Sequence, residues 1–262
     1  MKLSFCLLLS LVGVLLIRVA PADEIRRIAL DGSARTQGPG EETGKDGIVR
    51  IRKLAEPVLE LYPAAAQGGK GTVIIAPGGG YSILAVAHEG REVARWFNSA
   101  GWDAVVLLYH VGAGEPTREL ALADARAALR LVRTKGADFG LEATRVGLIG
   151  FSAGGHLCAR LAHETAPGEL AFVALIYPAY LDDQGKCRED VWPRSGPVFL
   201  YVAGDDKHAP ASFAYAKACQ EGGIRHEFSH PAQGGHGFGL KPDRPASVQD
   251  WPEKLGLFLG GL

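Results

Sequence analysis

Five stretches of nearly continuous apolar and β-branched residues recur along the chain, and they constrain its fold more than any other feature. They are TVIIAP (72–77), WDAVVLLY (102–109), TRVGLIG (144–150), LAFVALIYP (170–178) and GPVFLYVAG (196–204). Strands that are buried on both faces have this composition, which favours a parallel sheet covered by helices. PVLELYP (57–63) instead alternates polar and apolar residues, and it predicts a half-buried edge strand.

Segments with helical periodicity lie between these strands and after them. The segment 89–101 ends on a glycine, and the segment 116–136 opens with a proline and closes on Lys-Gly, as helices commonly do. Two further helices are predicted over 210–223 and in the tail from Ser247. Strands that alternate with helices predict an α/β fold with a mostly parallel central sheet, right-handed crossovers and helices on both faces.

The length of 262 residues suits one domain with a full core. We find no internal repeat and no linker that would separate a second domain. The sequence therefore predicts a single domain over 48–262. Residues 23–47 are rich in Gly, Asp, Glu and Thr without periodicity, and they predict a loosely ordered lead-in.

The first residues are typical of a targeting segment. Lys2 is followed by an apolar run over 3–17 and then by Ala-Pro-Ala at 20–22, which fits the small-residue pattern before a cleavage site. The run is too short for a comfortable membrane span. We therefore expect residues 1–22 to be a cleaved signal peptide and the mature protein to be secreted or periplasmic, without stable membrane insertion. An uncleaved amino-terminal anchor is the alternative.

Charge and cysteine content exclude several functional classes. The formal net charge is −1, so no global basic field favours nucleic acid or an anionic membrane. After cleavage three cysteines remain, at 158, 187 and 219. Their odd number and unpaired spacing predict neither a disulfide framework nor a zinc motif, although one bridge could form.

A serine lies at the junction of a predicted strand and a predicted helix, in VGLIGFSAGGHL (146–157). Gly150 and Gly154 flank Ser152 at two positions on either side, where larger side chains would collide in a sharp turn. This arrangement lets the hydroxyl stand above the sheet edge, at the amino terminus of the following helix. The pattern favours a nucleophilic Ser152 over an ordinary tight turn.

A serine nucleophile needs a base, and the base needs an orienting acid. In a doubly wound sheet both are expected in loops after later strands. His236 lies in such a glycine-rich loop, PAQGGHGFGL, after the strand-like RHEFSH. His226 and His230 belong to that strand, and His208 lies too close in sequence to the candidate acids. His156, one helical turn after the serine, is expected to pack within the helix layer.

The buried strand VFLYVAG ends on Asp205 and Asp206, which are the candidate acids. Adjacent side chains there project in different directions, so we expect only one to reach the imidazole. Asp206 is favoured because Asp205 lies closer to the strand end and could equally cap the turn. The choice between the two stays open at this point.

The run TVIIAPGGGYS takes an apolar strand into Gly78, Gly79 and Gly80. Three glycines let backbone N–H groups approach a substrate oxygen and stabilise an oxyanion, with the N–H of Ala153 as a second donor. A dinucleotide or phosphate loop is the weaker interpretation, because the spaced glycine pattern and the lysine of such loops are missing.

Together these motifs resemble the α/β-hydrolase superfamily, and within it the acetyl esterase/lipase group that includes acetylxylan- and feruloyl-esterase-like proteins. The resemblance runs from about Pro57 to the end of the chain. It is carried by PGGGYS, HEGREVARWF, ADARAALRLVR, VGLIGFSAGGHL, AGDDKHAP and GGHGFGL. It implies an α/β-hydrolase fold, and the short stretch between the serine and the acid leaves little room for a large lid.

The resemblance also implies roles for particular residues. Ser152 corresponds to the nucleophile and His236 to the base. The usual acid of the family, followed by three residues and a proline, falls on Asp206, with Pro210 as that proline. Gly79, Gly80 and Ala153 correspond to the oxyanion donors. Pro77 stands where many relatives carry a histidine, which bears on how this loop is braced.

The resulting hypothesis is a secreted serine esterase that hydrolyses carboxylic esters through a Ser-His-Asp triad and an acyl-enzyme. Its expected partners are small esters or short acyl groups, such as acetyl, on polysaccharide, and it needs no organic cofactor or metal. A serine peptidase of similar fold and a non-catalytic carbohydrate-binding module are the alternatives. Tyr81, Tyr180 and Trp192 are candidates to line the pocket.

Overall fold

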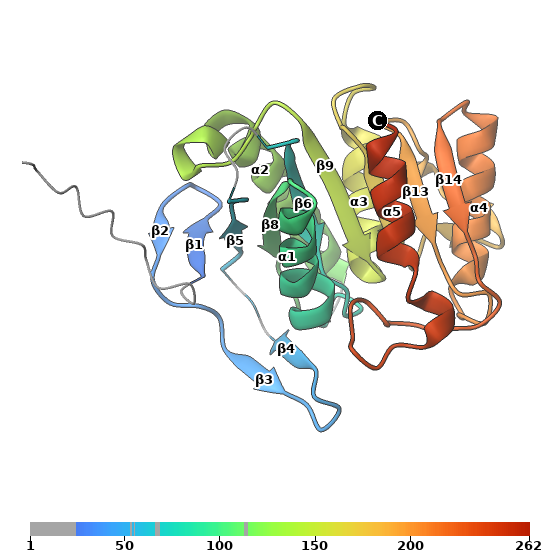
Figure 1. Cartoon of the computed structure of the whole chain (residues 1–262), viewed down its shortest axis with the longest axis horizontal. Coiled ribbons are helices and arrows are strands. Elements are labelled where there is room, and N and C mark those ends of the chain that lie inside the picture. The colour runs from blue at the N-terminus through green and yellow to red at the C-terminus, as the bar shows by residue number, and fades with distance from the viewer. Residues whose placement is uncertain (1–24, 53, 55, 66–68, 113–114) are drawn as a thin grey trace, which may run out of the picture.

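A nine-stranded sheet forms the centre of the protein (Figure 1). The computed structural model describes residues 25–262 except 53, 55, 66–68 and 113–114, and the predicted signal segment, 1–22, lies outside the described residues. The strand order is β14-β13-β10-β9-β6-β8-β5-β1-β2. All neighbours from β14 to β8 pair in parallel, whereas β8, β5, β1 and β2 pair antiparallel. A mostly parallel central sheet is therefore confirmed.

The strands of the central sheet follow the apolar runs of the sequence. Their bounds are β1 (Arg26–Ala29), β2 (Ala34–Arg35), β5 (Val58–Tyr62), β6 (Thr72–Ala76), β8 (Asp103–Leu108), β9 (Val146–Phe151), β10 (Val173–Ile176), β13 (Val198–Tyr201) and β14 (His226–Ser229). Every residue of β6, β8, β9, β10 and β13 is buried. These five strands are the five continuous apolar runs, because a strand covered on both faces has no solvent side for polar residues.

Short strands form two smaller sheets. Their bounds are β3 (Glu41–Thr43), β4 (Val49–Arg52) and β7 (Ile83–Leu84) in one, and β11 (Asp182–Asp183) and β12 (Lys186–Cys187) in the other. The hairpin of β3 and β4 extends beyond the lower edge of the main sheet in Figure 1.

Helices cover both faces of the sheet. Their bounds are α1 (Glu92–Ser99), α2 (Glu115–Lys135), α3 (Ala153–Glu164), α4 (Ala209–Glu221) and α5 (Trp251–Gly260). A π-helical turn, η1 (Ala87–Arg91), precedes α1, and short 3-10 turns occur at η2 (Gly136–Phe139), η3 (Glu189–Val191) and η4 (Ala246–Val248). Right-handed crossovers place α2, α3 and α4 on one face and α1 on the other. In Figure 1, α1 and α5 stand in front of the sheet.

The amino-terminal segment differs from the expected lead-in. Instead of being loosely ordered, its residues 26–29 form β1, which pairs antiparallel with β5 over four residue pairs. Ile28 and Ala29 are buried against the core. The segment contains few apolar residues, but a free strand edge on β5 supplies the backbone partners that order it.

The interpretation of 57–63 as an edge strand is wrong, since β5 pairs with β8 on one side and with β1 on the other. Glu60 is the polar residue that suggested a solvent side, and it is fully buried. Its carboxylate accepts hydrogen bonds from Arg27 and Arg91, with N···O distances of 2.7–3.0 Å. Buried ion pairing thus replaces solvent at this position.

Candidate active site

The turn between β9 and α3 holds Ser152 in a strained conformation. Ser152 has φ 51° and ψ −117° and is the residue before the first turn of α3. A Cβ on Gly150 would meet the backbone of Gly154, and a Cβ on Gly154 would meet the carbonyl oxygen of Ala76. The flanking glycines therefore allow the helix, the turn and β6 to approach closely. A strained serine that projects from such a turn is the geometry of a nucleophile elbow.

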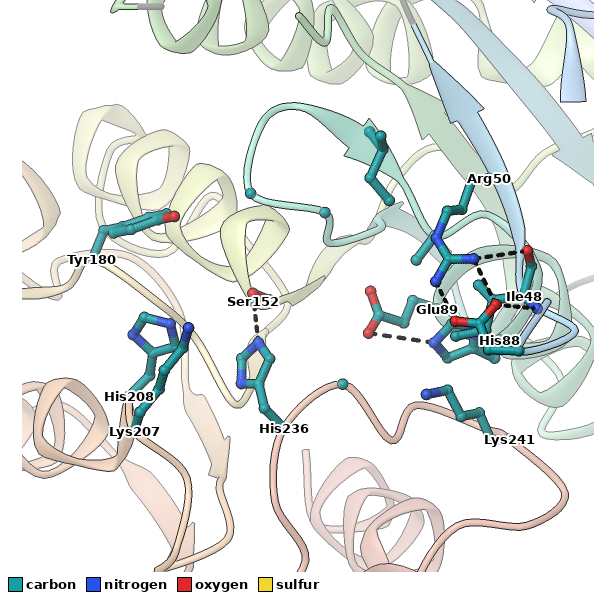
Figure 2. A pocket seen from close by; sticks show the side chains of 16 residues that line it. Ile48, Arg50, His88, Glu89, Ser152, Tyr180, Lys207, His208, His236 and Lys241 are labelled. Atoms are coloured by element: carbon teal, nitrogen blue, oxygen red, sulfur yellow. Dashed lines mark hydrogen bonds and ion pairs between the residues drawn. The ribbon is translucent and has the colours of Figure 1, made fainter. Parts of the chain in front are cut away.

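Three side chains that are far apart in sequence meet at the carboxyl ends of the parallel strands. His236 Nε2 lies 2.8 Å from Ser152 Oγ, and His236 Nδ1 lies 2.6 Å from Asp206 Oδ2; Figure 2 shows the serine and histidine side chains facing each other. A carboxylate only accepts, so Nδ1 carries the hydrogen and Nε2 is free to accept the serine proton. The structure brings the three predicted residues together.

Asp205 and Asp206 have different partners. The Asp206 side chain is fully buried, and its second oxygen accepts a hydrogen bond from the backbone N–H of His208 at 2.8 Å. Asp205 points elsewhere and accepts from the backbone N–H of Gly235 at 2.8 Å. Asp206 therefore contacts the imidazole, whereas Asp205 holds the loop immediately before His236.

Neither of the two nearby histidines contacts Ser152 through a hydrogen bond. His156 is buried on α3, and its Nδ1 lies 2.7 Å from the hydroxyl of Tyr81. Burial lowers the pKa of His156 to about 3, so the imidazole is neutral, as expected of a packing residue. His208 lies beside His236, with ring centroids 5.1 Å apart.

Gly79 and Gly80 line the same pocket as Ser152. Gly79 has φ 137° and Gly80 has φ 63°, and a Cβ on Gly79 would meet the carbonyl of Ile83. Within the described part of the chain, the N–H groups of Gly79 and Gly80 have no protein acceptor. Ala153 is the first residue of α3, so its N–H has no partner inside the helix. All three predicted donors are thus available to a substrate oxygen.

Glu89 and Tyr177 connect the glycine loop to the histidine loop, a link that the sequence analysis did not anticipate. Glu89 is buried and accepts hydrogen bonds from Gly78 N and from the Tyr177 hydroxyl, both at 2.8 Å. The same hydroxyl accepts from Gly239 N at 2.8 Å, and the Tyr177 ring packs against His236 at 5.0 Å. Burial raises the pKa of Glu89. Glu89 is one of four charged residues in the segment 89–101, so no local pattern singles it out.

A pocket of about 450 Å³ opens over Ser152 (Figure 2). Its walls come from the β3–β4 hairpin, the glycine loop, η1, the loop after β13 and the loop that carries His236. Tyr180 lines it, as anticipated, but Tyr81 is buried and Trp192 lines a different pocket beside α4. Charged side chains from the hairpin and the two later loops border the pocket.

Some features of other protein classes are missing from the described residues. In that part of the chain, no helix combines the length and hydropathy needed to cross a membrane, and no three His, Cys, Asp or Glu side chains cluster as metal ligands would. Cys158, Cys187 and Cys219 are all free thiols.

The sheet order, the serine turn and the contacts of His236 with Ser152 and Asp206 fit the α/β-hydrolase fold, which the sequence motifs predicted. Comparison with known families agrees: residues 73–193 match a family described as alpha/beta hydrolase fold. The chain therefore has the α/β-hydrolase fold.

Similar proteins include ester hydrolases. An acetylxylan esterase of Xylanibacter ruminicola is 33% identical over 116 residues, which are 43% of this chain and 23% of that protein. An acetyl ester-xyloside bifunctional hydrolase from Caldicellulosiruptor lactoaceticus has a solved structure that superposes with a TM-score of 0.68 at 27% identity, covering 79% of this chain and 88% of that one. A carboxylesterase of Lactobacillus plantarum shares the fold, with a TM-score of 0.64 at 20% identity over 86% and 98% of the two chains.

Proposed function

We propose that the protein is a serine esterase that hydrolyses short-chain carboxylic esters, with acetyl groups on polysaccharide as a substrate class. The single observation that carries the proposal is the Ser152–His236–Asp206 arrangement, with O···N distances of 2.8 and 2.6 Å. Hydrolase relatives that act on acetyl esters support the reaction class. The amino-terminal targeting pattern supports secretion or a periplasmic location.

In this mechanism His236 Nε2 takes the proton of Ser152 Oγ as the oxygen attacks the ester carbonyl. Asp206 accepts a hydrogen bond from the Nδ1–H group and stabilises the imidazolium that forms. The N–H groups of Gly79 and Ala153, with Gly80 beside them, stabilise the negative oxygen of the tetrahedral intermediate. The imidazolium then protonates the departing alcohol.

The second half of the reaction repeats the same steps with water. His236 removes a proton from a water molecule, which attacks the acyl group on Ser152, and the collapse of the second intermediate releases the carboxylic acid. The serine recovers its proton from the imidazolium. The pocket admits water from the solvent, since the His236 side chain keeps 29% of its surface exposed.

The decisive experiment combines activity with active-site labelling. Ser152→Ala is expected to abolish hydrolysis of 4-nitrophenyl acetate and labelling by a fluorophosphonate probe, while the protein keeps its circular dichroism spectrum. Hydrolysis of the ester by Ser152→Ala at the wild-type rate would refute the proposal.

The acid is tested by a matched pair of variants. Asp206→Asn should lower kcat by about 10⁴-fold, because an amide stabilises the wrong imidazole tautomer. Asp205→Asn keeps an oxygen that can accept from Gly235 N and should change kcat less than about threefold. The opposite ranking would assign the acid to Asp205.

The alternative classes give different results with the same protein. A serine peptidase would cleave peptide substrates and would be labelled by the probe in the same way. A carbohydrate-binding module would bind xylan without turnover and without labelling. A panel of acetylated xylan, feruloyl esters, short aryl esters and peptides therefore distinguishes all three.

A further inference from the structure

The charged side chains around the pocket are not balanced. Apart from histidines, five charged residues line it: the acids Asp46 and Glu89 and the cations Arg50, Lys207 and Lys241. The chain as a whole has a net charge of −1, so an excess of cations at this one place does not follow from overall composition.

Both acids are already engaged. Asp46 accepts hydrogen bonds from the Arg50 guanidinium at 2.8 and 2.5 Å, so these two charges cancel. Glu89 is buried and accepts from Gly78 N and from the Tyr177 hydroxyl, and burial raises its pKa, which disfavours its charged form.

The two lysines, by contrast, are uncompensated. Among the residues that the structure describes, neither ammonium group lies within 4.0 Å of a carboxylate oxygen. Lys207 follows Asp206 on one side of the Ser152–His236 pair, and Lys241 lies on the other side (Figure 2). His88 of η1 also lines the pocket, and burial, followed by the charge of Lys241, lowers its pKa to about 4. This coupling indicates that the Lys241 ammonium acts on the interior of the pocket.

We propose that this pocket selects esters that carry a carboxylate on their acyl or alcohol half, with Lys207 and Lys241 as the specificity-determining residues. The inference rests on the proposed esterase function and names its substrate class. Cations on both sides of a nucleophile attract an anionic ester during encounter and hold it in the complex, and salt weakens both effects. Acidic sugar esters and monoesters of dicarboxylic acids have this chemistry.

The test compares anionic esters with neutral esters of nearly the same shape. On the alcohol side, 4-acetoxybenzoate is paired with its methyl ester. On the acyl side, the mono-4-nitrophenyl ester of adipic acid is paired with 4-nitrophenyl hexanoate. For each pair the ratio of kcat/KM, anionic over neutral, is measured in wild type and variants. The two esters of a pair differ in intrinsic reactivity by the same factor for every protein, so this factor cancels when the ratios of two proteins are compared.

The variants are Lys207→Glu, Lys241→Glu and their combination, with Lys217→Glu as the control. Lys217 lies on α4, lines a different pocket and is 76% exposed, so its reversal makes the same change in net charge elsewhere. Each pocket variant should lower the anionic-to-neutral ratio about fivefold for at least one pair, and the double variant should lower it more. The pair that responds identifies the half of the ester that carries the charge.

The control and the neutral esters separate this inference from the proposed function. Lys217→Glu should leave both ratios within twofold of wild type and should hydrolyse the neutral esters at the wild-type rate. Raising the salt concentration to 0.5 M should lower the wild-type ratio but not that of the double variant. If both ratios stay within twofold in the double variant while the neutral esters are hydrolysed, the anion selectivity is refuted and the esterase stands.

Discussion

Tyr177 and Glu89 hold together the two loops that carry the glycine donors and His236, and removing one hydroxyl tests that link. Gly239 N donates to the Tyr177 hydroxyl, the hydroxyl donates to Glu89 Oε1, and Gly78 N donates to Glu89 Oε2, each at 2.8 Å. Tyr177→Phe breaks the first two bonds at once. We expect both loops to shift relative to Ser152.

The expected loss of stability follows from the hydrogen bonds that the variant removes. Tyr177→Phe leaves the Gly239 N–H buried without a partner, and it leaves Glu89 Oε1 with only His88 Nε2, 3.6 Å away. Each loss costs about 1–3 kcal/mol, so the free energy of unfolding should fall by about 2–6 kcal/mol. Glu89→Gln keeps an oxygen for Gly78 N and loses only the acceptor of the tyrosine hydrogen, so its loss should be smaller, about 1 kcal/mol.

Activity should fall in a way that a purely structural role does not explain. In the proposed mechanism the oxyanion donors act only in the transition state. A displaced loop should therefore lower kcat by about 10–100-fold and leave KM within about threefold. The assay is hydrolysis of 4-nitrophenyl acetate with kcat calculated per site titrated by a fluorophosphonate, which removes any contribution from unfolded protein.

Tyr201→Phe is the matched control. Tyr201 is equally buried, but its hydroxyl bonds to Asp250 Oδ1 at 2.5 Å, away from both loops. This variant should lose stability and keep kcat per titrated site. The reasoning is refuted if Tyr177→Phe also keeps kcat per titrated site within twofold of wild type.

Three further predictions concern stability. His156 has a pKa of about 6.5 in the unfolded chain but of about 3 in the fold. The free energy of unfolding therefore keeps the full His156 contribution above pH 6.5 and falls below it by up to about 1.4 kcal/mol per pH unit. His156→Gln should flatten this pH dependence in urea denaturation measured from pH 7 to 4. Arg91→Ala leaves the buried carboxylate of Glu60 with the Arg27 guanidinium and the Tyr62 hydroxyl and should lower the unfolding free energy by about 3 kcal/mol, whereas a loss below 1 kcal/mol in the same assay would contradict that ion-pair role. Gly150→Ala pushes a methyl group into the backbone of α3 and should reduce both the melting temperature and kcat, measured by calorimetry and ester hydrolysis.

The fold could be predicted because its determinants are local. Continuous apolar runs and helical spacing are properties of neighbouring residues, and they gave the buried strands and helices within a few positions. The serine turn was recognisable for the same reason, since its glycines and its strand and helix are contiguous. The edge assignment of 57–63 was wrong because the pairing partner of β5 lies in a polar segment with little local preference for a strand.

The candidate site was only partly accessible to the same reasoning. Its chain order of serine, acid and histidine suggested a triad, but the directions of two adjacent side chains depend on packing, so only the fold shows Asp206 facing His236. Glu89 and Tyr177 are 88 residues apart and form their bond because η1 and the end of β10 approach each other. No local pattern encodes that contact.

The amino-acid sequence by itself determined the α/β class, the order of strands and helices and the exposed serine turn, since these follow from short-range periodicity and backbone freedom. Only the tertiary structure decided which acid meets the imidazole, which buried groups join the two loops and which lysines remain without a carboxylate. Those features arise where distant segments pack together, because hydrogen bonds and ion pairs between such segments form only after the sheet has brought them within a few ångströms.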